Sequence, residues 1–224
     1  MRGAVLAVSD VGEAGEFYGR ILGLEVEPVG EGLCVAGCVL KLVEGKARHP
    51  PGSYLYHVAL RVPDRRSLGA LLKKVLEFEE VVEGFADHLV SESVYVRDFD
   101  GIGVEIYADK PRGRGVVLMD ALPLDVGRLL REAGDKPAGV ELGHVHMRTA
   151  LVGEAERFYN ALSFKTTYRW RGAAFLAYGD YHHHFAFNPW PVPPPKEGSS
   201  LLEVHMGLDV DAADPLGMRL RGSV

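Results

Sequence analysis

The sequence lacks the long apolar runs, charge clusters and leader segments that mark several classes of protein. None of its stretches approaches the ~20 apolar residues that a membrane-spanning helix needs. The N-terminal segment MRGAVLAVSD turns polar too early for a signal peptide. The formal net charge is -6, and no run of Lys or Arg concentrates the positive potential that binds a nucleic acid backbone. We therefore expect a cytoplasmic protein with neither a membrane nor a nucleic acid as a partner.

Cysteine is also scarce, since Cys34 and Cys38 are the only two in the chain. They lie in the apolar segment GLCVAGCVLKL, which is typical of a hairpin. A single C-x3-C pair without a second pair is a weak signal for zinc. We therefore expect two buried thiols.

The most informative feature that is present is a repeated pattern. Three segments combine a short alternating strand, a break and an amphipathic helix with apolar residues at helical spacing. The segments begin at Ala4, His57 and His144. In the first and third, the helix carries Phe-Tyr at the same offset from the strand, at Phe17-Tyr18 and Phe158-Tyr159. This coincidence indicates an internal repeat.

Each repeat is followed by stretches rich in Val, Leu, Tyr and Gly, so each unit reads as a strand, a helix and about three more strands. The sequence therefore predicts an α+β fold of repeated βαβββ units, in which DFDG joins two strands of the second unit. The expected division is unit 1 at 1–50, unit 2 at 51–112, a connector with a short helix at 113–138, unit 3 at 139–190, and a proline-rich loop with a truncated unit 4 at 191–224. In unit 4 we expect the helix and the middle strands to be missing.

Two motifs carry a family resemblance. The second unit closes with DHLVSESVYVRDFDGIGVEIYADKPR, and the third ends with YHHHFAFNPW before a proline-rich loop. Together with the repeats, these motifs resemble the vicinal oxygen chelate superfamily of glyoxalases, bleomycin resistance proteins and extradiol dioxygenases. The pattern is most similar to catechol 2,3-dioxygenase-type proteins. The resemblance implies units that pair into cup-shaped mixed or antiparallel sheets.

The resemblance also implies a metal site. Its first-strand ligand position falls on His57 in unit 2 and on His144 in unit 3, whereas units 1 and 4 place Gly3 and Val204 there. Its last-strand carboxylate position falls on Glu105. This set of two histidines and one carboxylate requires units 2 and 3 to pair with each other, leaving unit 1 to pack against unit 4.

Two further observations bear on these ligands. Glu105 stands between apolar residues on a strand expected to be buried, which is costly unless the carboxylate is paired or binds a cation. His146 lies two residues after His144 and would point toward the same cavity. It is a second candidate ligand if the assumed register is wrong by two residues.

A 2-His-1-carboxylate set leaves coordination positions open and is typical of non-haem iron(II) oxygenases. We therefore expect Fe(II), with Mn(II), Zn(II) or Ni(II) as alternatives. The resemblance further implies an extradiol dioxygenase that cleaves a small aromatic diol with dioxygen. Three residues match catalytic or substrate-binding positions of the family: His183, which would move protons, and Tyr95 and His88, which would hydrogen-bond the substrate.

Other interpretations remain open at this point. The three consecutive histidines could be a weak metal-binding tract, although on a strand His182 and His184 would face away from His183. Tyr95 could be a core aromatic, and His88 could be a residue of a loop. A glyoxalase-type metal-dependent isomerase or lyase, or a non-catalytic small-molecule-binding protein, would fit the same fold. A homodimer is a further expectation from the resemblance.

Overall fold

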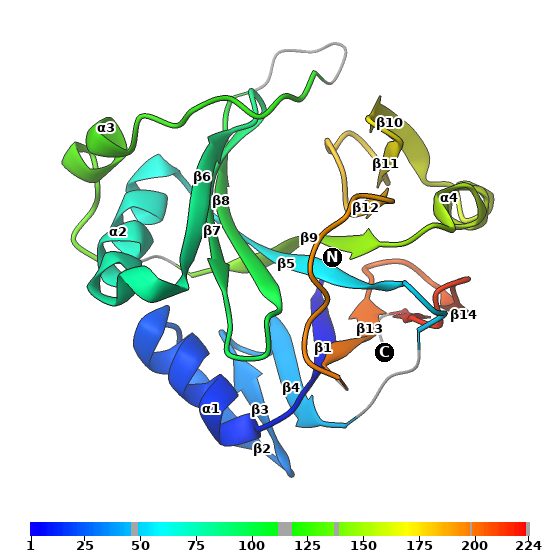
Figure 1. Cartoon of the computed structure of the whole chain (residues 1–224), viewed down its shortest axis with the longest axis horizontal. Helices are drawn as coiled ribbons and strands as arrows, with labels where there is room; N and C mark the ends of the chain where they lie inside the picture. Colours follow the sequence, from blue (N-terminus) through cyan, green and yellow to red (C-terminus); the bar gives the residue numbers. More distant parts are fainter. Residues whose placement is uncertain (46–48, 112–117, 137–138, 198, 223–224) are drawn as a thin grey trace.

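The computed structural model describes residues 1–45, 49–111, 118–136, 139–197 and 199–222. Its strands form two curled sheets, which lie against each other in the middle of the molecule (Figure 1). One sheet has 8 strands in the order β10-β11-β12-β9-β5-β8-β7-β6, and the other has 7 in the order β14-β15-β13-β1-β4-β3-β2. The predicted α+β class is confirmed.

The first two repeats each contain a strand, a helix and three strands. The first consists of β1 (Gly3–Val8), α1 (Val11–Gly15), its π-helical continuation η1 (Glu16–Ile21), β2 (Val26–Val29), β3 (Gly32–Val35) and β4 (Leu40–Glu44). The second consists of β5 (Tyr54–Val62), α2 (Arg65–Val75), a 3-10 turn η2 (Leu76–Val81), β6 (Val82–Asp87), β7 (Ser91–Arg97) and β8 (Gly103–Asp109).

Short polar residues start the helices. Asp10 accepts a hydrogen bond from the backbone of Glu13, and Asp64 accepts one from Ser67. Each thereby satisfies an N–H group that the first helical turn leaves unpaired. The chain can therefore turn sharply from the first strand of a repeat into its helix.

The second half of the chain repeats the pattern less completely. After α3 (Val126–Arg131), the third repeat consists of β9 (Glu141–Arg148), α4 (Val152–Ala161), β10 (Lys165–Trp170), β11 (Ala173–Ala177) and β12 (Phe185–Asn188). The last repeat consists of β13 (Ser200–His205), β14 (Asp211–Ala213) and β15 (Arg219–Arg221). No helix separates β13 from β14 in this described segment, as predicted. The expectation that both middle strands are missing is wrong, because β14 pairs antiparallel with β15.

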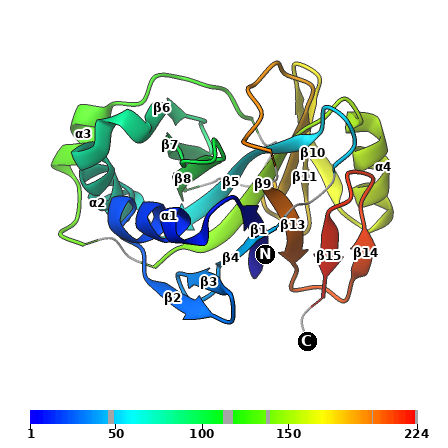
Figure 2. The same cartoon turned by 60° about the horizontal axis from the view of Figure 1, so that its bottom comes forward.

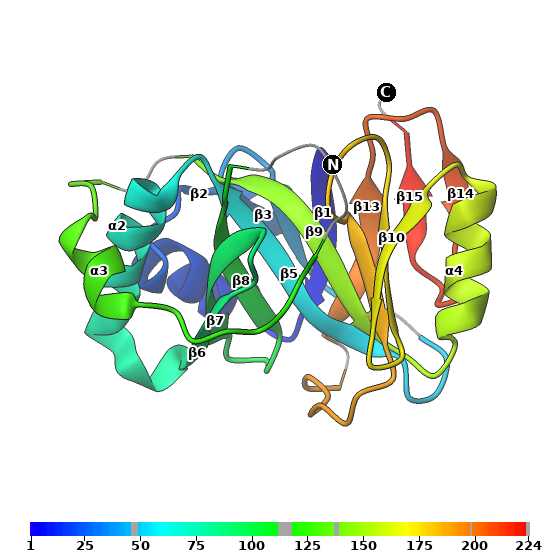
Figure 3. The ribbon, with the colours of Figure 1, turned by 90° about the horizontal axis from the view of Figure 1, so that it is seen from above.

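Each sheet is assembled from two repeats. The first strands of the second and third repeats, β5 and β9, pair antiparallel and run side by side through the centre of the molecule (Figure 3). The first strands of the other two repeats, β1 and β13, also pair antiparallel. Helices α1, α2 and α3 gather at one end of the molecule and α4 lies at the other end (Figure 2).

The alternation of side chains along β5 separates the core from the site. Val58 and Leu60 point into the main hydrophobic cluster, which includes residues of both sheets. His57 and Ala59 point to the other face, because successive side chains of a strand alternate. The same strand therefore helps to build the core and to support the polar residues described below.

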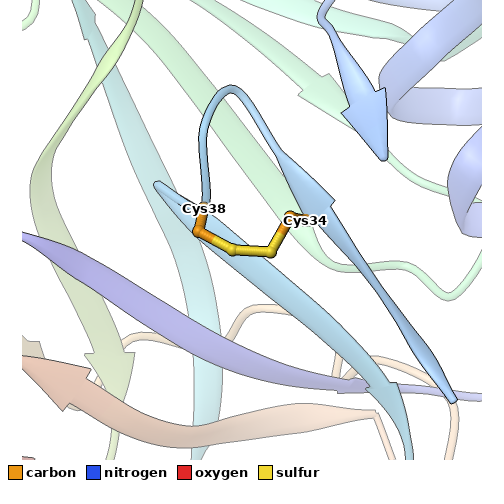
Figure 4. The surroundings of a disulfide bond; sticks show 2 residues. All are labelled: Cys34 and Cys38. Carbon is orange, nitrogen blue, oxygen red and sulfur yellow. A yellow bond between two sulfur atoms is a disulfide. The ribbon is translucent and has the colours of Figure 1, made fainter. Parts of the chain in front are cut away.

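The structure corrects the expectation of two buried thiols. Cys34 and Cys38 form a disulfide across the end of the β3–β4 hairpin, with their Cα atoms 4.4 Å apart (Figure 4). Cys34 is buried, whereas Cys38 is exposed. A reducing cytoplasm would open such a bond, and the cytoplasmic location stays a prediction. Among the described residues, no helix has both the length and the apolar character needed to cross a bilayer.

Candidate metal centre

Three neighbouring strands bring His57, Glu105 and His144 together. They belong to β5, β8 and β9, which lie side by side with β5 in the middle. Ala59 of β5 is directly opposite both Glu105 and His144 in the strand register. Side chains at opposed positions share one face of a sheet, so the three residues surround the small Ala59 side chain. The sheet thus leaves space where their polar atoms meet.

The three side chains converge on one point. His57 Nε2 lies 3.1 Å from Glu105 Oε2 and 3.2 Å from His144 Nε2. His144 Nε2 lies 3.0 Å from Glu105 Oε2. All three residues are at most 5% exposed. The cluster is therefore compact, and it is shielded from bulk water.

The protonation of the cluster suits a cation. Burial by itself would raise the pKa of Glu105, but the neighbouring His144 and His57 bring this pKa well below its usual value. Burial lowers the pKa of His144 to about 4, so its imidazole is neutral. Ser93 Oγ donates a hydrogen bond of 2.6 Å to Glu105 Oε1 and fixes the carboxylate. Deprotonated ligands of this kind are the ones that metal ions bind.

The spacing of the donor atoms fits a divalent ion. Two ligands at right angles, each about 2.1 Å from an ion, are about 3.0 Å apart, which is close to the three separations found here. Without an ion, His57 Nε2 and His144 Nε2 would each need a hydrogen to donate to Glu105. These two N–H groups would then face each other across the 3.2 Å contact between the histidines, with no acceptor between them. A cation removes this conflict because it attracts the lone pairs of all three atoms. The cluster could therefore hold a divalent metal.

Ring packing, rather than a further hydrogen bond, orients His144. Its Nδ1 is buried and has no hydrogen-bond partner in the part of the chain that the structure describes. The ring centroid lies 4.1 Å from that of His183 and 5.2 Å from that of Tyr107. Gly143 makes room for Tyr107, because a Cβ at this position would overlap the tyrosine hydroxyl.

The cluster lies in the wall of a cavity of about 260 Å³. Aromatic side chains make up much of the remaining wall: Tyr56, Tyr95, Tyr168, Trp170, Phe175 and Trp190. Of these, Phe175 lies on β11 and Trp190 follows β12. Phe185 and Phe187 face the other way and pack against Tyr159 of α4.

The predicted catalytic residues line the same cavity. His183 is nearly buried, with its ring against His144 and 5.1 Å from the ring of Phe175. His88 Nε2 lies 2.6 Å from the Tyr95 hydroxyl, and His88 Nδ1 lies 2.7 Å from the carbonyl oxygen of Asp120. Burial, followed by the charge of Glu105, raises the pKa of Tyr95 well above 10. Its hydroxyl therefore stays protonated.

The three consecutive histidines are not on a strand, although a strand was assumed when His182 and His184 were expected to face away from His183. They precede β12, and the ring of His182 lies beside that of His183, with centroids 4.6 Å apart, instead of on the opposite face. His182 is fully buried with its Nδ1 2.8 Å from His183 Nδ1, whereas His184 is half-buried beside Tyr181. Strand periodicity gave the wrong orientation for His182 because the segment is irregular.

His146 does not join the three-residue cluster. It lies on the same face of β9 as His144, as its spacing predicts, and it lines the cavity. Its Nε2 is 2.7 Å from Asn188 Nδ2 on β12, so this nitrogen already has a partner. Burial, followed by the nearby histidines, lowers the pKa of His146 well below its usual value.

Sequence reasoning missed several residues of the site. Tyr56 precedes His57, so strand alternation predicts that it faces the opposite side of β5. It nevertheless lines the cavity, and the pairing of β5 with β9 is irregular at this point, between Leu55 and His57. Met119 comes from the connector after β8. Neither residue has a sequence signal, because a bulge and the path of a connector depend on tertiary packing.

Comparison with known proteins agrees with this fold. Residues 3–106 match the family model described as Glyoxalase/Bleomycin resistance protein/Dioxygenase superfamily. The chain is 36% identical over 168 residues to a protein of Bacillus subtilis (strain 168) named catechol-2,3-dioxygenase. That alignment covers 67% of this chain and 59% of the relative, so the chain spans about three fifths of the relative's length.

Solved structures show the same architecture at low sequence identity. A candidate dioxygenase from Bacillus subtilis has a TM-score of 0.60 at 13% identity, covering 92% of this chain and 68% of that chain. Glyoxalase I from Zea mays has a TM-score of 0.55 at 16% identity, covering 92% of this chain and 73% of that chain. At these identities the likeness concerns the fold alone. From the matched family model, supported by the sequence relative, we conclude that residues 3–106 of the chain belong to the glyoxalase/bleomycin resistance protein/dioxygenase superfamily.

Proposed function

We propose that this chain is a non-haem iron(II)-dependent extradiol dioxygenase that opens the ring of a catechol-like aromatic diol with dioxygen. One observation carries the proposal: three buried donor atoms, two imidazole and one carboxylate, meet in the wall of an aromatic-lined cavity. Three ligands leave positions for other molecules, which is the arrangement of non-haem iron oxygenases. The name of the Bacillus relative supports the same chemistry.

The ligands proposed to hold the ion are His57, Glu105 and His144. Iron(II) bound there would supply the Lewis-acid and redox chemistry that the reaction between a diol and dioxygen needs. The single carboxylate offsets part of the charge of the ion, and Ser93 holds that carboxylate in place.

The cavity residues would bind and orient the diol. Tyr168, Trp170 and Trp190 offer apolar surface to an aromatic ring and exclude water. Tyr95 and His88, joined by their hydrogen bond, present a hydroxyl for a substrate oxygen. We assign His183 the role of taking a proton from a substrate hydroxyl, because it lines the cavity beside His144.

The proposal is tested by anaerobic purification, loading with Fe(II), and elemental analysis, followed by a panel of catechols. We expect about one iron per chain, oxygen uptake that depends on the catechol, and a yellow ring-opened product. His57→Ala and Glu105→Gln should lose both iron and activity. Glu141→Gln, which changes a carboxylate on the exposed end of β9, is the matched control and should keep both.

Other results would favour the alternatives. Tight binding of zinc or nickel with isomerase or lyase activity and no oxygen uptake would replace the dioxygenase by a glyoxalase-type enzyme. Failure of every tested divalent metal to bind to the wild type would leave a non-catalytic binding protein. In either case the assignment of iron to this cluster would be wrong.

A further inference from the structure

A chain of polar contacts runs from the cavity into the protein behind His183. His183 Nδ1 lies 2.8 Å from His182 Nδ1. On the other side of that ring, His182 Nε2 lies 2.9 Å from Asp109 Oδ1 at the end of β8. His182 is fully buried, and Asp109 is partly buried. The chain thus connects a cavity side chain with a carboxylate outside the cavity wall.

Asp109 is held as a charged acceptor. Burial would raise its pKa, but the contacts with His182 and Arg61 lower the pKa below its usual value. Arg61 Nη1 lies 3.3 Å from Asp109 Oδ2, and the Tyr181 hydroxyl donates to both carboxylate oxygens at 3.1 and 3.2 Å. An ionised carboxylate can only accept hydrogen bonds. His182 Nε2 must therefore carry a hydrogen to make its contact with Asp109.

This contact determines the tautomers of both histidines. A neutral imidazole has one N–H and one lone pair, so Nδ1 of a neutral His182 is an acceptor. The partner nitrogen, His183 Nδ1, must then be the donor. In a neutral His183 this leaves Nε2 with the lone pair.

Neighbouring residues fix the position of His182. Thr167 on β10 donates its hydroxyl hydrogen to the backbone carbonyl of His182. The ring of Tyr181 lies against the ring of His182, with centroids 4.0 Å apart. His182 is not on a strand, but Asp109 of β8 and Thr167 of β10 both hydrogen-bond to it. The contact between His182 and His183 is therefore part of a fixed arrangement.

We propose that Asp109 and His182 are positioning residues that hold His183 in the Nδ1–H tautomer, so that its Nε2 is the atom that accepts the substrate proton. The tautomer follows from the contacts alone, and its use in ring cleavage rests on the proposed function. The proton would move from the substrate hydroxyl to Nε2, while Nδ1–H continues to donate to His182. The resulting positive charge would face Asp109 through His182, much as a carboxylate supports a catalytic histidine in other enzymes.

The tautomer can be measured without metal or substrate. Long-range proton–nitrogen NMR spectra of metal-free protein labelled with 15N-histidine distinguish Nδ1–H from Nε2–H, and a His183→Gln spectrum assigns the signal. We expect Nδ1–H for His183 in the wild type. Asp109→Asn should shift the signal toward the other tautomer, because an amide can also donate to His182.

A matched control and a second variant complete the experiment. Glu141→Gln removes the other carboxylate that contacts Arg61 but leaves the Asp109–His182 contact, so its spectrum should match the wild type. If Asp109→Asn does not fold, His182→Phe keeps Asp109 and should also release His183. An Nε2–H tautomer in the wild type, or no change in either folded variant, overturns the proposal.

Kinetics separate a positioning role from a structural one. In the iron-loaded protein, Asp109→Asn should lower kcat by on the order of 100-fold, the lower range for loss of one general base, with KM and iron content little changed. Equal losses of iron and activity would instead indicate a structural role and overturn the proposal. If the tautomer shifts as expected but the wild type cleaves no catechol, the positioning role of Asp109 and His182 is supported and the proposed dioxygenase function is wrong.

Discussion

Tyr95 presents a hydroxyl group to the cavity, and burial beside Glu105 keeps this hydroxyl protonated. Tyr95 lies opposite Glu105 in the register of β7 and β8, so both side chains share the face that carries the proposed metal ligands. Its hydroxyl contacts His88, a residue of the loop before β7. A residue that is held in this way can hydrogen-bond a substrate oxygen without binding the ion.

Tyr95→Phe should therefore weaken catalysis while keeping the iron. One hydrogen bond to a charged group contributes about 1.5 kcal/mol, which corresponds to roughly a tenfold change. We expect kcat/KM for catechol to fall about tenfold or more, with iron content unchanged by elemental analysis. Unchanged kinetics would place Tyr95 among the packing aromatics of the cavity.

A second residue, Asp98, should make stability depend on pH. It begins the DFDG turn and accepts backbone hydrogen bonds from Asp100 and Ile102. Burial, together with the charge of Asp100, raises its pKa to about 7, although Arg97 acts in the opposite direction. Burial, followed by the charge of Asp98, in turn raises the pKa of the Tyr18 hydroxyl. The folded state therefore binds a proton at Asp98 more tightly than the unfolded state does.

Because this pKa is raised on folding, the contribution of Asp98 is most favourable below pH about 4 and declines as the pH rises to about 7. The slope is at most about 1.4 kcal/mol per pH unit. Asp98→Asn keeps an acceptor for the turn and should remove this decline. The free energy of unfolding of the variant should therefore rise relative to that of the wild type between pH 4 and 7. Urea unfolding at several pH values checks this, with the exposed Asp211→Asn as control. Parallel curves for wild type and Asp98→Asn would contradict the expectation.

At the scale of elements, the metal cluster depends on the order β8-β5-β9. Sequence repeats indicated the units, because strand alternation and helical spacing are local properties. The positions of His57, Glu105 and His144 followed from the family resemblance. They could not place Tyr56, whose orientation departs from strand alternation, or His182, which lies in an irregular segment. The Cys34–Cys38 bond was also missed, since bringing two thiols together depends on how the hairpin closes.

Ala59 tests this arrangement because it lies between the ligands on the middle strand and is fully buried. Ala59→Leu should place a larger side chain where the three donor atoms converge, and we expect iron binding to fall at least tenfold. Ala59→Gly is the control that leaves the space open. Circular dichroism verifies that both variants fold, and elemental analysis measures their iron. Full iron loading of a folded Ala59→Leu variant would show that the ion is held elsewhere.

At the scale of the whole molecule, two sheets share one core. The main hydrophobic cluster includes Leu6 and Val204 from the 7-stranded sheet and Leu60 and Val104 from the 8-stranded sheet. The candidate metal centre is confined to the 8-stranded sheet. Since the sheets bury their apolar side chains against each other, we expect the described part of the chain to unfold in one cooperative transition.

Metal binding should consequently stabilise the whole molecule, including the sheet that carries no ligand. At a free metal concentration of 100 times Kd, the free energy of unfolding rises by about 2.7 kcal/mol. In a protein of this size that corresponds to a rise in Tm of roughly 5–10 °C. Anaerobic calorimetry with and without Fe(II) measures this shift, and Glu105→Gln should show almost none. Two separate transitions, of which only one responds to iron, would show instead that the two sheets unfold independently and that their common core contributes little to cooperativity.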